Sequence, residues 1–313
     1  MATAPVALKD QHPVHAAVPC THALVAPALV APALAAYDIT VAFGARGVLG
    51  GISTAIRSGT ITAIIGPNAA GKSTLLRVLA GVLEPQGGQV LLGGQLVRSI
   101  APSRRAAALA FASSGTGSGA GGLAAAAALG VGQFTAIGCA GLVPPLSPEA
   151  ACAAVGNALA RTGLSDRATD PLGVLSSGLQ QLATLARVLV QLDGSTAAGA
   201  EAHGGARAGG HDLTGKVLLL DEPTSAMDPR HIQLVLGLLR QLAARGAAVV
   251  LATHDLSLAC HADAVLMLGS DGRVAADGPT EAVMTAQRLG DVYGVGFEVI
   301  TRPGKRPIVL PAI

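Results

Sequence analysis

Residues 66–74 read GPNAAGKST, and this stretch decides the fold of the chain. It follows the apolar run ITAII (61–65) and leads into LLRVLAG (75–81). The segment satisfies the pattern G-x-x-x-x-G-K-[ST], whose glycines let backbone N–H groups turn inward toward phosphate oxygens. Because it lies after an expected strand and before an expected helix, we interpret it as a phosphate-binding loop and not as a chance glycine-rich turn.

The residues of this loop have separate expected roles. Lys72 would supply positive charge to the β- and γ-phosphates of a nucleotide, and the Ser73 hydroxyl would be a ligand of Mg²⁺. The helix expected from Lys72 to about Leu79 would direct its positive N-terminal end at the same anion. The residues expected to hold the nucleotide are Gly66, Pro67, Asn68, Ala69, Ala70, Gly71, Lys72, Ser73 and Thr74.

A second motif is KVLLLDEPTSAMD, residues 216–228. Its apolar run is typical of a buried parallel strand, which ends in Asp221 and Glu222. Ligands of open α/β sheets bind at the carboxyl ends of strands, and two adjacent carboxylates there are costly unless they meet a metal or a proton. We therefore expect Asp221 to share Mg²⁺ with Ser73, and Glu222 to polarise the attacking water as the general base.

A histidine completes the predicted site. His254 lies in THD (253–255), just after the apolar run AAVVLA (247–252) that predicts another strand. Its position at a strand end, one helix after Glu222, would bring it near the same phosphates. There it could donate a hydrogen bond to the γ-phosphate or orient the water. A structural histidine is the alternative.

The bulk composition limits the possible functions. The 313 residues are enough for one large or two ordinary domains, and half of them are hydrophobic. Net charge is +2 without a dense Lys/Arg patch, which argues against nucleic acid as a partner. The four cysteines include no C-x-x-C pair, so a reduced cytosolic protein fits best.

Residues 1–36 are interpreted as a disordered Ala/Pro-rich arm, in which VAPAL occurs twice in tandem. A signal peptide is the alternative, but Lys9 is the only Lys or Arg before the apolar run, and Pro27 and Pro32 interrupt it.

The uncharged stretch 106–148 is rich in Gly and Ala, which argues against a spanning helix. We expect contact with a membrane only through a partner.

The remaining pattern predicts an α/β fold, with strands alternating with helices in a mainly parallel sheet. Strands are expected at YDITVAFG, GISTAIRSG, ITAII and QVLLGG, and a hairpin turned at Asp271–Gly272 follows later. The Ala-rich block 104–192 is expected to be mostly helical, as an inserted subdomain. Residues 193–212 are low in complexity and are expected to form a flexible surface insertion. We expect the arm and this insertion to be dispensable for catalysis.

From Tyr37 to Leu310 the chain resembles the ATPase subunit of an ABC transporter. The resemblance rests on GPNAAGKST, LSSGLQQ, LLLDEP, SAMD and THD, in the order of that family. It implies a P-loop NTPase core with an antiparallel β subdomain and an inserted α-helical subdomain, in an ATPase domain spanning 37–313. In the family, the position of Phe43 stacks on adenine and the position of Asp228 belongs to the D-loop.

The resemblance also implies partners. LSSGL would be the signature segment, in which Ser176, Ser177 and Gly178 open a helix and meet the γ-phosphate of ATP bound to a second ATPase subunit. Two chains, most simply a homodimer, would then sandwich two ATP molecules with Mg²⁺. Separate transmembrane permease subunits would hold the chain at the cytoplasmic face of the inner or plasma membrane, and a substrate-binding protein would act indirectly.

The C-terminal residues indicate which branch of this family the chain resembles. LGDVYGVGFEVITRPGKRPIVLP (289–311) resembles the ends of ATPases that serve importers of iron–siderophore chelates, haem and cobalamin. GPNAAGKSTLLR and SAMDPRHIQLVL point to the same branch. The tail does not contact substrate in such proteins, so it does not name the cargo.

Three departures from the family matter. Ser114 aligns with a glutamine whose amide contacts Mg²⁺ and water, Ser177 replaces a usual glycine, and Ala69 replaces another. They leave open a degenerate nucleotide-binding subunit with little turnover, although Lys72 and Glu222 are intact. A soluble ABC ATPase acting on DNA or ribosomes is a further alternative, but the chain shows neither coiled-coil arms nor tandem cassettes.

Overall fold

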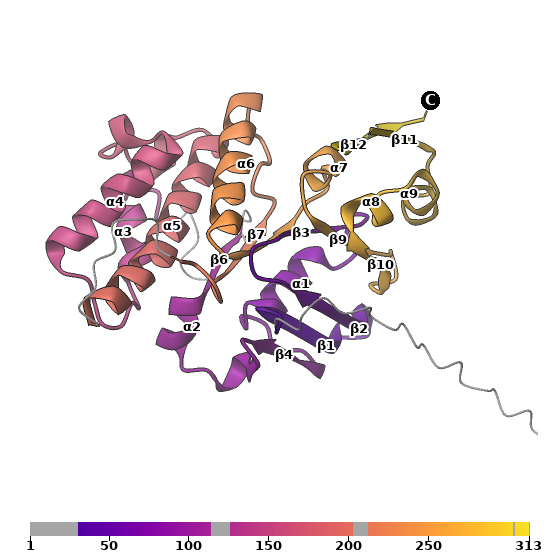
Figure 1. The fold of residues 1–313 in the computed structure, drawn as a ribbon, viewed down its shortest axis with the longest axis horizontal. Helices are drawn as coiled ribbons and strands as arrows, with labels where there is room; N and C mark the ends of the chain where they lie inside the picture. Colours follow the sequence, from indigo (N-terminus) through magenta and orange to yellow (C-terminus); the bar gives the residue numbers. More distant parts are fainter. Residues whose placement is uncertain (1–30, 114–125, 203–211, 303, 313) are drawn as a thin grey trace, which may run out of the picture. The chain divides into compact units, whose positions relative to one another are not determined.

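The computed structural model describes residues 31–113, 126–202, 212–302 and 304–312, and only the backbone of 195–202. These residues belong to the compact unit Ala31–Ile313 (Figure 1). Residues 1–30 of the expected arm lie outside the described residues, as do Ser114 and residues 203–211 of the expected insertion.

The central sheet has the strand order β10-β9-β3-β8-β7-β6 (Figure 1). Pairing is parallel from β9 to β6, and only β10 runs antiparallel to its neighbour. All residues of β3, β7 and β8 are buried, as the continuous apolar runs predicted. The mainly parallel sheet is thereby confirmed. The bounds are β3 Ile61–Ile65, β6 Leu109–Ser113, β7 Val217–Asp221, β8 Ala248–Ala252, β9 Ala264–Leu268 and β10 Val274–Pro279.

Two hydrophobic cores cover the two faces of this sheet. Ile64 and Leu219 pack in the core that includes Leu75 of α1 (Lys72–Leu79). Their neighbours Ile65 and Leu218 belong to the other core, which contains residues of α5 (Ser177–Ala202) and α6 (Pro229–Ala244). Successive strand residues thus face opposite cores, which is why the strand sequences are apolar without alternation.

An antiparallel sheet of order β2-β1-β4-β5 lies on the α1 side of the molecule. Its strands are β1 Leu34–Phe43, β2 Arg46–Ile56, β4 Gly87–Leu92 and β5 Gln95–Leu96. This confirms the expected antiparallel part but corrects its start, because 34–36 had been assigned to the arm. Leu34 is fully buried and pairs with Ile56 and Leu92. The Ala/Pro repeat before it hides the beginning of the strand in the sequence.

The Ala-rich block 104–192 contains α3 (Val131–Ala136), α4 (Pro148–Thr162) and most of α2 (Pro102–Ala108) and α5. The start of α4 follows its sequence signature, because the Ser147 hydroxyl accepts a hydrogen bond from the Ala150 N–H at 3.2 Å. The helix ends at Gly163, whose φ of 69° is left-handed. Short 3₁₀ turns occupy Val97–Ser99, Ile137–Cys139, Ser165–Arg167 and Leu172–Val174.

The block 104–192 also contains a strand that the sequence analysis did not assign. β6 pairs in parallel with β7, from Leu109↔Val217 to Ser113↔Asp221, and so belongs to the central sheet. Its sequence, LAFAS, is short and lies among alanines. Alanine has little strand preference, so pairing with β7 decides the conformation here.

A second difference concerns residues 193–202, which were expected to be part of a flexible insertion. They continue α5 to Ala202. Alanine is the strongest helix former, which explains why an Ala-rich low-complexity stretch can extend a packed helix. Asp193 accepts hydrogen bonds from Arg161 of α4 at 2.7 Å and from Arg245 after α6 at 2.8 Å.

The C-terminal part follows β8 and β9. It contains α7 (Leu256–Ala259), α8 (Thr280–Val283), α9 (Ala286–Tyr293) and the hairpin of β11 (Phe297–Arg302) and β12 (Lys305–Pro311). The hairpin of β9 and β10 turns at Asp271–Gly272 as predicted, with Gly272 at a φ of 71°. No helix in the described part of the chain has the length and apolarity needed to cross a membrane.

Candidate active site

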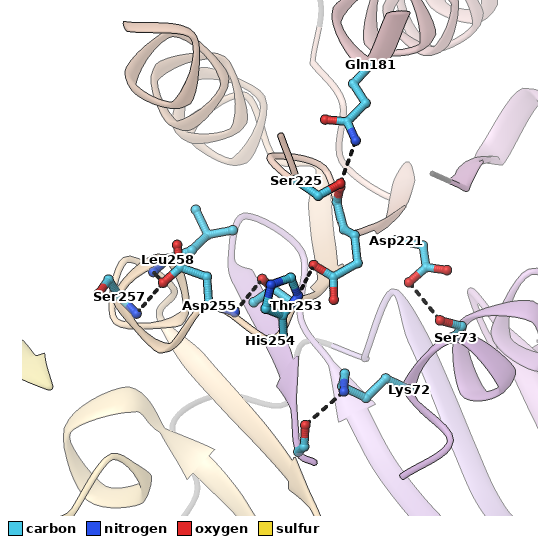
Figure 2. Close-up of polar contacts among 12 residues, drawn as sticks. Lys72, Ser73, Gln181, Asp221, Ser225, Thr253, His254, Asp255, Ser257 and Leu258 are labelled. Atoms are coloured by element: carbon cyan, nitrogen blue, oxygen red, sulfur yellow. Dashed lines mark hydrogen bonds and ion pairs between the residues drawn. The ribbon is translucent and has the colours of Figure 1, made fainter. Parts of the chain in front are cut away.

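The three predicted motifs meet at the carboxyl ends of neighbouring strands (Figure 2). Gly66 follows β3, Asp221 is the last residue of β7, and Thr253 follows β8. Since β3, β8 and β7 are consecutive in the parallel sheet, their carboxyl ends form one edge. This is the edge at which α/β sheets bind ligands.

Two glycines shape the phosphate loop. Gly66 has a φ of 151°, and a Cβ there would lie 2.5 Å from the Leu268 carbonyl oxygen. Gly71 has a φ of 93°, and a Cβ there would lie 2.6 Å from Leu49 Cδ2. Side chains are therefore excluded at both ends of the loop, which explains the glycine positions of the motif.

The loop residues between these glycines differ in exposure. The Pro67 carbonyl accepts a hydrogen bond from the Ala70 N–H at 3.2 Å, and Ala70 is buried. Asn68 and Ala69 are exposed. Ala69 has a φ of 64°, a left-handed conformation that an L residue adopts at a cost. Thr74 is half-buried in the first turn of α1, which no side chain caps.

Lys72 is buried, and its ammonium group is held by backbone carbonyls. Its Nζ donates hydrogen bonds to the Gly66 oxygen at 2.8 Å and to the Pro67 oxygen at 3.0 Å. Burial lowers the pKa of Lys72 from its usual value, although the carboxylates of Glu222 and Asp221 act in the opposite direction. The positive charge is thus partly desolvated, and it interacts with the carboxylates of Asp221, at the end of β7, and of the next residue, Glu222.

Ser73 and Asp221 form the pair expected at the metal position. The Ser73 hydroxyl donates a hydrogen bond to Asp221 Oδ1 at 3.0 Å (Figure 2). Asp221 is 7% exposed. Burial raises the pKa of its carboxyl group, and the hydrogen bond from Ser73 opposes this shift. A cation would stabilise the ionised carboxylate more than the present contacts do.

Glu222 and His254 form a second polar pair at the same edge. His254 Nδ1 lies 2.9 Å from Glu222 Oε2, so this nitrogen carries the proton of the hydrogen bond. The His254 side chain is 65% exposed and that of Glu222 is 23% exposed. Glu222 has a φ of 49°, which is rare and strained for a residue with a side chain.

The turn that carries His254 is stabilised on both sides. The Thr253 hydroxyl accepts a hydrogen bond from the Asp255 N–H at 3.0 Å. Asp255 Oδ1 in turn accepts from the N–H groups of Ser257 and Leu258, which caps α7. Asp255 belongs to the THD motif, for which only His254 had a predicted role. An Asp before a short apolar segment is an N-cap signal that could have identified it.

The signature segment has different neighbours from the phosphate loop. Ser176 precedes α5, and its hydroxyl accepts a hydrogen bond from the Leu179 N–H at 3.4 Å. A Cβ on Gly178 would lie 3.1 Å from the Ala226 carbonyl oxygen and 3.4 Å from Met227 Cγ. These residues contact α5 and the segment after Glu222. Ser177, the first residue of α5, is exposed.

Two further predicted residues lie at exposed positions. Phe43 ends β1 with 54% of its surface exposed. Asp228 is the N-cap of α6, and Oδ1 accepts a hydrogen bond from the His231 N–H at 3.0 Å. Asp228 Oδ2 also lies 2.9 Å from His231 Nδ1. The backbone hydrogen bond from His231 lowers the pKa of the Asp228 carboxyl group.

The structure adds a contact that the sequence analysis did not anticipate. Gln181 of α5 donates a hydrogen bond from Nε2 to the Ser225 hydroxyl at 2.6 Å (Figure 2). Ser225 donates from its own hydroxyl and its backbone N–H to the Glu222 carbonyl oxygen, each at 3.3 Å. Gln181 lies in LSSGLQQ and Ser225 in KVLLLDEPTSAMD, but nothing in the sequence pairs residues so far apart in the chain.

The donor set fits Mg²⁺ bound to a phosphate. Ser73 and Asp221 offer hydroxyl and carboxylate oxygens, the hard ligands that Mg²⁺ prefers together with substrate phosphates. The first turn of α1 has no acidic residue and no side-chain cap, so its N–H groups remain for an anion. The arrangement can hold a metal-bound polyphosphate, with a carboxylate–histidine pair beside it.

Family comparisons agree with these motifs. The sequence model of the ABC transporter family matches residues 49–193. A second model, an AAA domain described with the AbiEii toxin of a type IV toxin–antitoxin system, matches residues 149–259. The two matched ranges together include the phosphate loop, the signature segment, the acidic pair and His254.

Known proteins are similar over most of the chain. The hemin import ATP-binding protein HmuV of Rhodopseudomonas palustris is 35% identical over 263 residues, covering 84% of this chain and 88% of that protein. HmuV of Bradyrhizobium diazoefficiens is 36% identical over 269 residues, covering 86% of this chain and 90% of that protein.

Solved structures share the fold. A metal-chelate type ABC transporter in an inward-facing conformation matches with a TM-score of 0.66 at 21% identity, covering 90% of this chain and 98% of that chain. A dimeric ATP-binding cassette bound to ADP and Pi matches with a TM-score of 0.61 at 20% identity, covering 79% and 98%. These likenesses show the fold, and the relatives above show that the chain belongs to the family of ABC transporter ATP-binding subunits.

Proposed function

We propose that this chain is the ATP-hydrolysing subunit of an importer for haem or a related metal chelate. The observation that carries the proposal is the meeting of three elements at one sheet edge. These are the buried Lys72, the Ser73–Asp221 pair and the Glu222–His254 pair. The family to which the chain belongs uses ATP, so the substrate proposed for this edge is ATP.

The binding side of the proposed site consists of the phosphate loop and α1. Lys72 would exchange its contacts with loop carbonyls for the phosphates, and loop N–H groups would hold the remaining oxygens. Ser73 and Asp221 would hold Mg²⁺. When bound, Mg²⁺ would neutralise charge on the β- and γ-phosphates. Phe43, at the exposed end of β1, would stack on the adenine.

The reacting side consists of Glu222 and His254. Glu222 would accept a proton from the attacking water and so act as the general base. His254 would hold the Glu222 carboxylate through Nδ1, leaving Nε2 to face the γ-phosphate. Phosphate binding by Lys72 and proton transfer by Glu222 would thus be carried out by different side chains.

Hydrolysis would require a second copy of the chain. Ser176 and Ser177 are exposed at the start of α5, with the buried Gly178 next to them, and a helix N-terminus favours an anion. We propose that they meet the γ-phosphate of ATP on the partner subunit, with Asp228 at the same interface. A dimer would thus contain two complete sites, each formed from both chains.

The transport assignment comes from the relatives. The curated relatives at 35% and 36% identity are named hemin import ATP-binding proteins. We propose the same cargo class, iron-containing chelates and haem, for the system that this chain drives. Permease subunits would hold the chain peripherally at the cytoplasmic face of the membrane. A substrate-binding protein would deliver the cargo to the permease and would not contact this chain.

The test is a steady-state ATPase assay with and without the permease in membranes, followed by uptake of radiolabelled haem and a ferric siderophore into vesicles. The proposal expects ATP turnover that rises with the permease and uptake of one cargo class that depends on ATP. Turnover without any ATP-dependent uptake would contradict the transport role while leaving the ATPase assignment intact.

A second candidate is favoured by the substitutions at Ser114 and Ser177. The family glutamine at position 114 would reach Mg²⁺ and water, which a serine cannot do unaided, so the chain could bind ATP as a slow regulatory subunit. Single-turnover hydrolysis of wild type and Ser114→Gln separates the two cases. A large gain in the variant supports the slow subunit, whereas ordinary turnover in the wild type contradicts it.

A further inference from the structure

Gln181 presents a buried polar atom without a partner. Its Nε2 donates to the Ser225 hydroxyl at 2.6 Å. Its Oε1 is buried and accepts no hydrogen bond among the described residues. Buried side-chain oxygens are nearly always paired, so this atom requires an explanation.

The side chain borders a small cavity at the reacting side of the site. The cavity has a volume of about 30 Å³. Its lining is mostly apolar, from Ala112, Leu185, Leu220 and Pro223. The polar residues that line it are Gln181 and Thr184 of α5, and Asp221, Glu222 and Ser113 at the ends of β7 and β6. A water requires roughly 10–15 Å³ of such space and several polar partners, so this cavity has room for a bound water.

Glu222 needs support from its surroundings. Its φ of 49° is left-handed, and residues with side chains keep such a conformation only when the surrounding contacts impose it. Its N–H donates to the Ala252 carbonyl oxygen at 2.9 Å, and its carbonyl oxygen accepts from the Ser225 hydroxyl and N–H at 3.3 Å. Gln181 is the residue from α5 that holds the Ser225 hydroxyl in this network.

We propose that Gln181 is a positioning residue for hydrolysis, acting on Glu222 in two ways. Its amide NH₂ holds Ser225 and thereby the strained backbone of Glu222. Its amide oxygen accepts a hydrogen bond from a water in the cavity, and that water donates to the carboxylate of Glu222. A movement of α5 therefore changes the position of the general base, without a change in the phosphate loop.

This inference rests on the proposed function, because it concerns the turnover of ATP. The variants are Gln181→Leu, which removes both polar atoms at similar size, and Ser225→Ala, which removes one oxygen atom and keeps the fold testable if the first variant unfolds. The matched control is Gln191→Leu. Gln191 also lies on α5 and donates from Nε2 to the carbonyl oxygens of Ala106 and Leu109, at 2.7 and 3.1 Å.

We expect Gln181→Leu and Ser225→Ala each to lower kcat about tenfold, while the Kd of a fluorescent ATP analogue stays within about twofold. The double variant should lose no more than Gln181→Leu alone, because Ser225→Ala breaks only the link to Ser225 that Gln181→Leu already breaks. Gln191→Leu should lower the melting temperature without lowering kcat. Single variants whose losses multiply in the double variant, or a kcat near wild type, would overturn the inference.

A second measurement does not depend on activity. Amide hydrogen exchange of the nucleotide-free full chain should be faster at Glu222, Thr224 and Ser225 in Gln181→Leu and Ser225→Ala, and unchanged there in Gln191→Leu. Unchanged exchange in the first two variants would overturn the inference. If wild type hydrolyses no ATP, the proposed function fails, and the exchange experiment still decides whether Gln181 holds Glu222.

Discussion

The phosphate loop and the Glu222–His254 pair lie at the same sheet edge, but they differ in burial and in backbone conformation. Lys72 and Asp221 are buried, and their charged groups contact carbonyl and hydroxyl oxygens of the same chain. His254 is 65% exposed, and Glu222 has a left-handed backbone that its neighbours must hold. The side chains that would bind the phosphates are therefore held by contacts within the site. The position of Glu222, in contrast, depends on residues outside it.

The difference has a physical origin. A phosphate loop positions N–H groups through its backbone, which Gly66 and Gly71 make possible, so few side chains are needed. Proton transfer requires a side-chain carboxylate at a defined place, and its rotamer and backbone must be fixed by neighbours. Substitutions on the two sides should consequently change different quantities, affinity on the first and turnover on the second.

Glu222→Gln should have the largest effect, and on turnover alone. The amide cannot accept the proton of water but can still accept the hydrogen bond from His254, so kcat should fall roughly 10²-fold or more while ATP binds as before. Gel filtration with ATP should then reveal a trapped dimer. The same change at Glu281, an exposed residue of α8, is the control. Wild-type turnover in Glu222→Gln would reject the role of general base.

Lys72→Met tests the other side, where affinity should change. A charge-assisted hydrogen bond contributes roughly 2 kcal/mol, so the Kd of ATP should rise about 30-fold. The nucleotide-free variant should melt at a higher temperature, because the wild-type ammonium group is desolvated in the folded chain. A lower melting temperature would show that the carbonyl contacts outweigh burial.

The pH dependence of stability follows from the same shift. The pKa of Lys72 is lowered from 10.5 on folding, so the folded chain binds fewer protons at this residue than the unfolded chain. Stability contributed by Lys72 should therefore increase as pH rises through the range below 10.5, and this part of the slope should be lost in Lys72→Met. The part from Lys216, whose pKa burial also lowers, should remain in both proteins. Urea unfolding of both proteins across that range measures the difference in slope.

The same contrast separates what the sequence could predict from what it could not. Local sequence patterns predict several parts of the site, because glycine spacing and apolar runs involve consecutive residues. These parts are the phosphate loop, the start of α1, the strand ends at Asp221 and Ala252, and the position of His254 just after the second strand. The contact between Gln181 and Ser225 joins residues 44 positions apart, and only tertiary packing creates it.

Alanine-rich segments account for the structural differences. The start of β1 at Leu34, the strand β6 and the last turns of α5 all lie in stretches where Ala dominates. Alanine is small and apolar in any conformation, so periodicity carries little information there. The partners decide the outcome, as when β6 pairs with β7, or when Asp193 contacts Arg161 and Arg245.

Ser73→Ala should have a smaller effect that depends on the metal. Removing the hydroxyl takes away one expected Mg²⁺ ligand and the hydrogen bond to Asp221 Oδ1. In Mg²⁺ the affinity for ATP should fall about tenfold, corresponding to roughly 1.4 kcal/mol, whereas in EDTA wild type and variant should bind equally. An equal loss in both buffers would place the role of Ser73 in the loop itself and not in metal binding.

Ala69→Gly should have the smallest effect, and it examines the conformation of the loop directly. Ala69 has a φ of 64°, a left-handed conformation that costs an L residue about 1 kcal/mol and costs glycine nothing. Glycine also gains conformational freedom in the unfolded chain, which offsets part of the stabilisation from the relieved strain. The free energy of unfolding should therefore rise by at most about 1 kcal/mol. Nucleotide affinity should stay the same, because the loop N–H groups keep their positions.

Ala70→Gly makes the same chemical change at the next residue, which is buried and has no left-handed φ. There glycine relieves no strain and loses a buried methyl group, so the free energy of unfolding should fall by about 1 kcal/mol. Urea unfolding of the two nucleotide-free variants thus predicts opposite signs at adjacent alanines. If both variants are destabilised equally, the left-handed conformation of Ala69 does not persist in solution. The phosphate loop would then be less ordered than the buried Lys72 and Asp221 indicate.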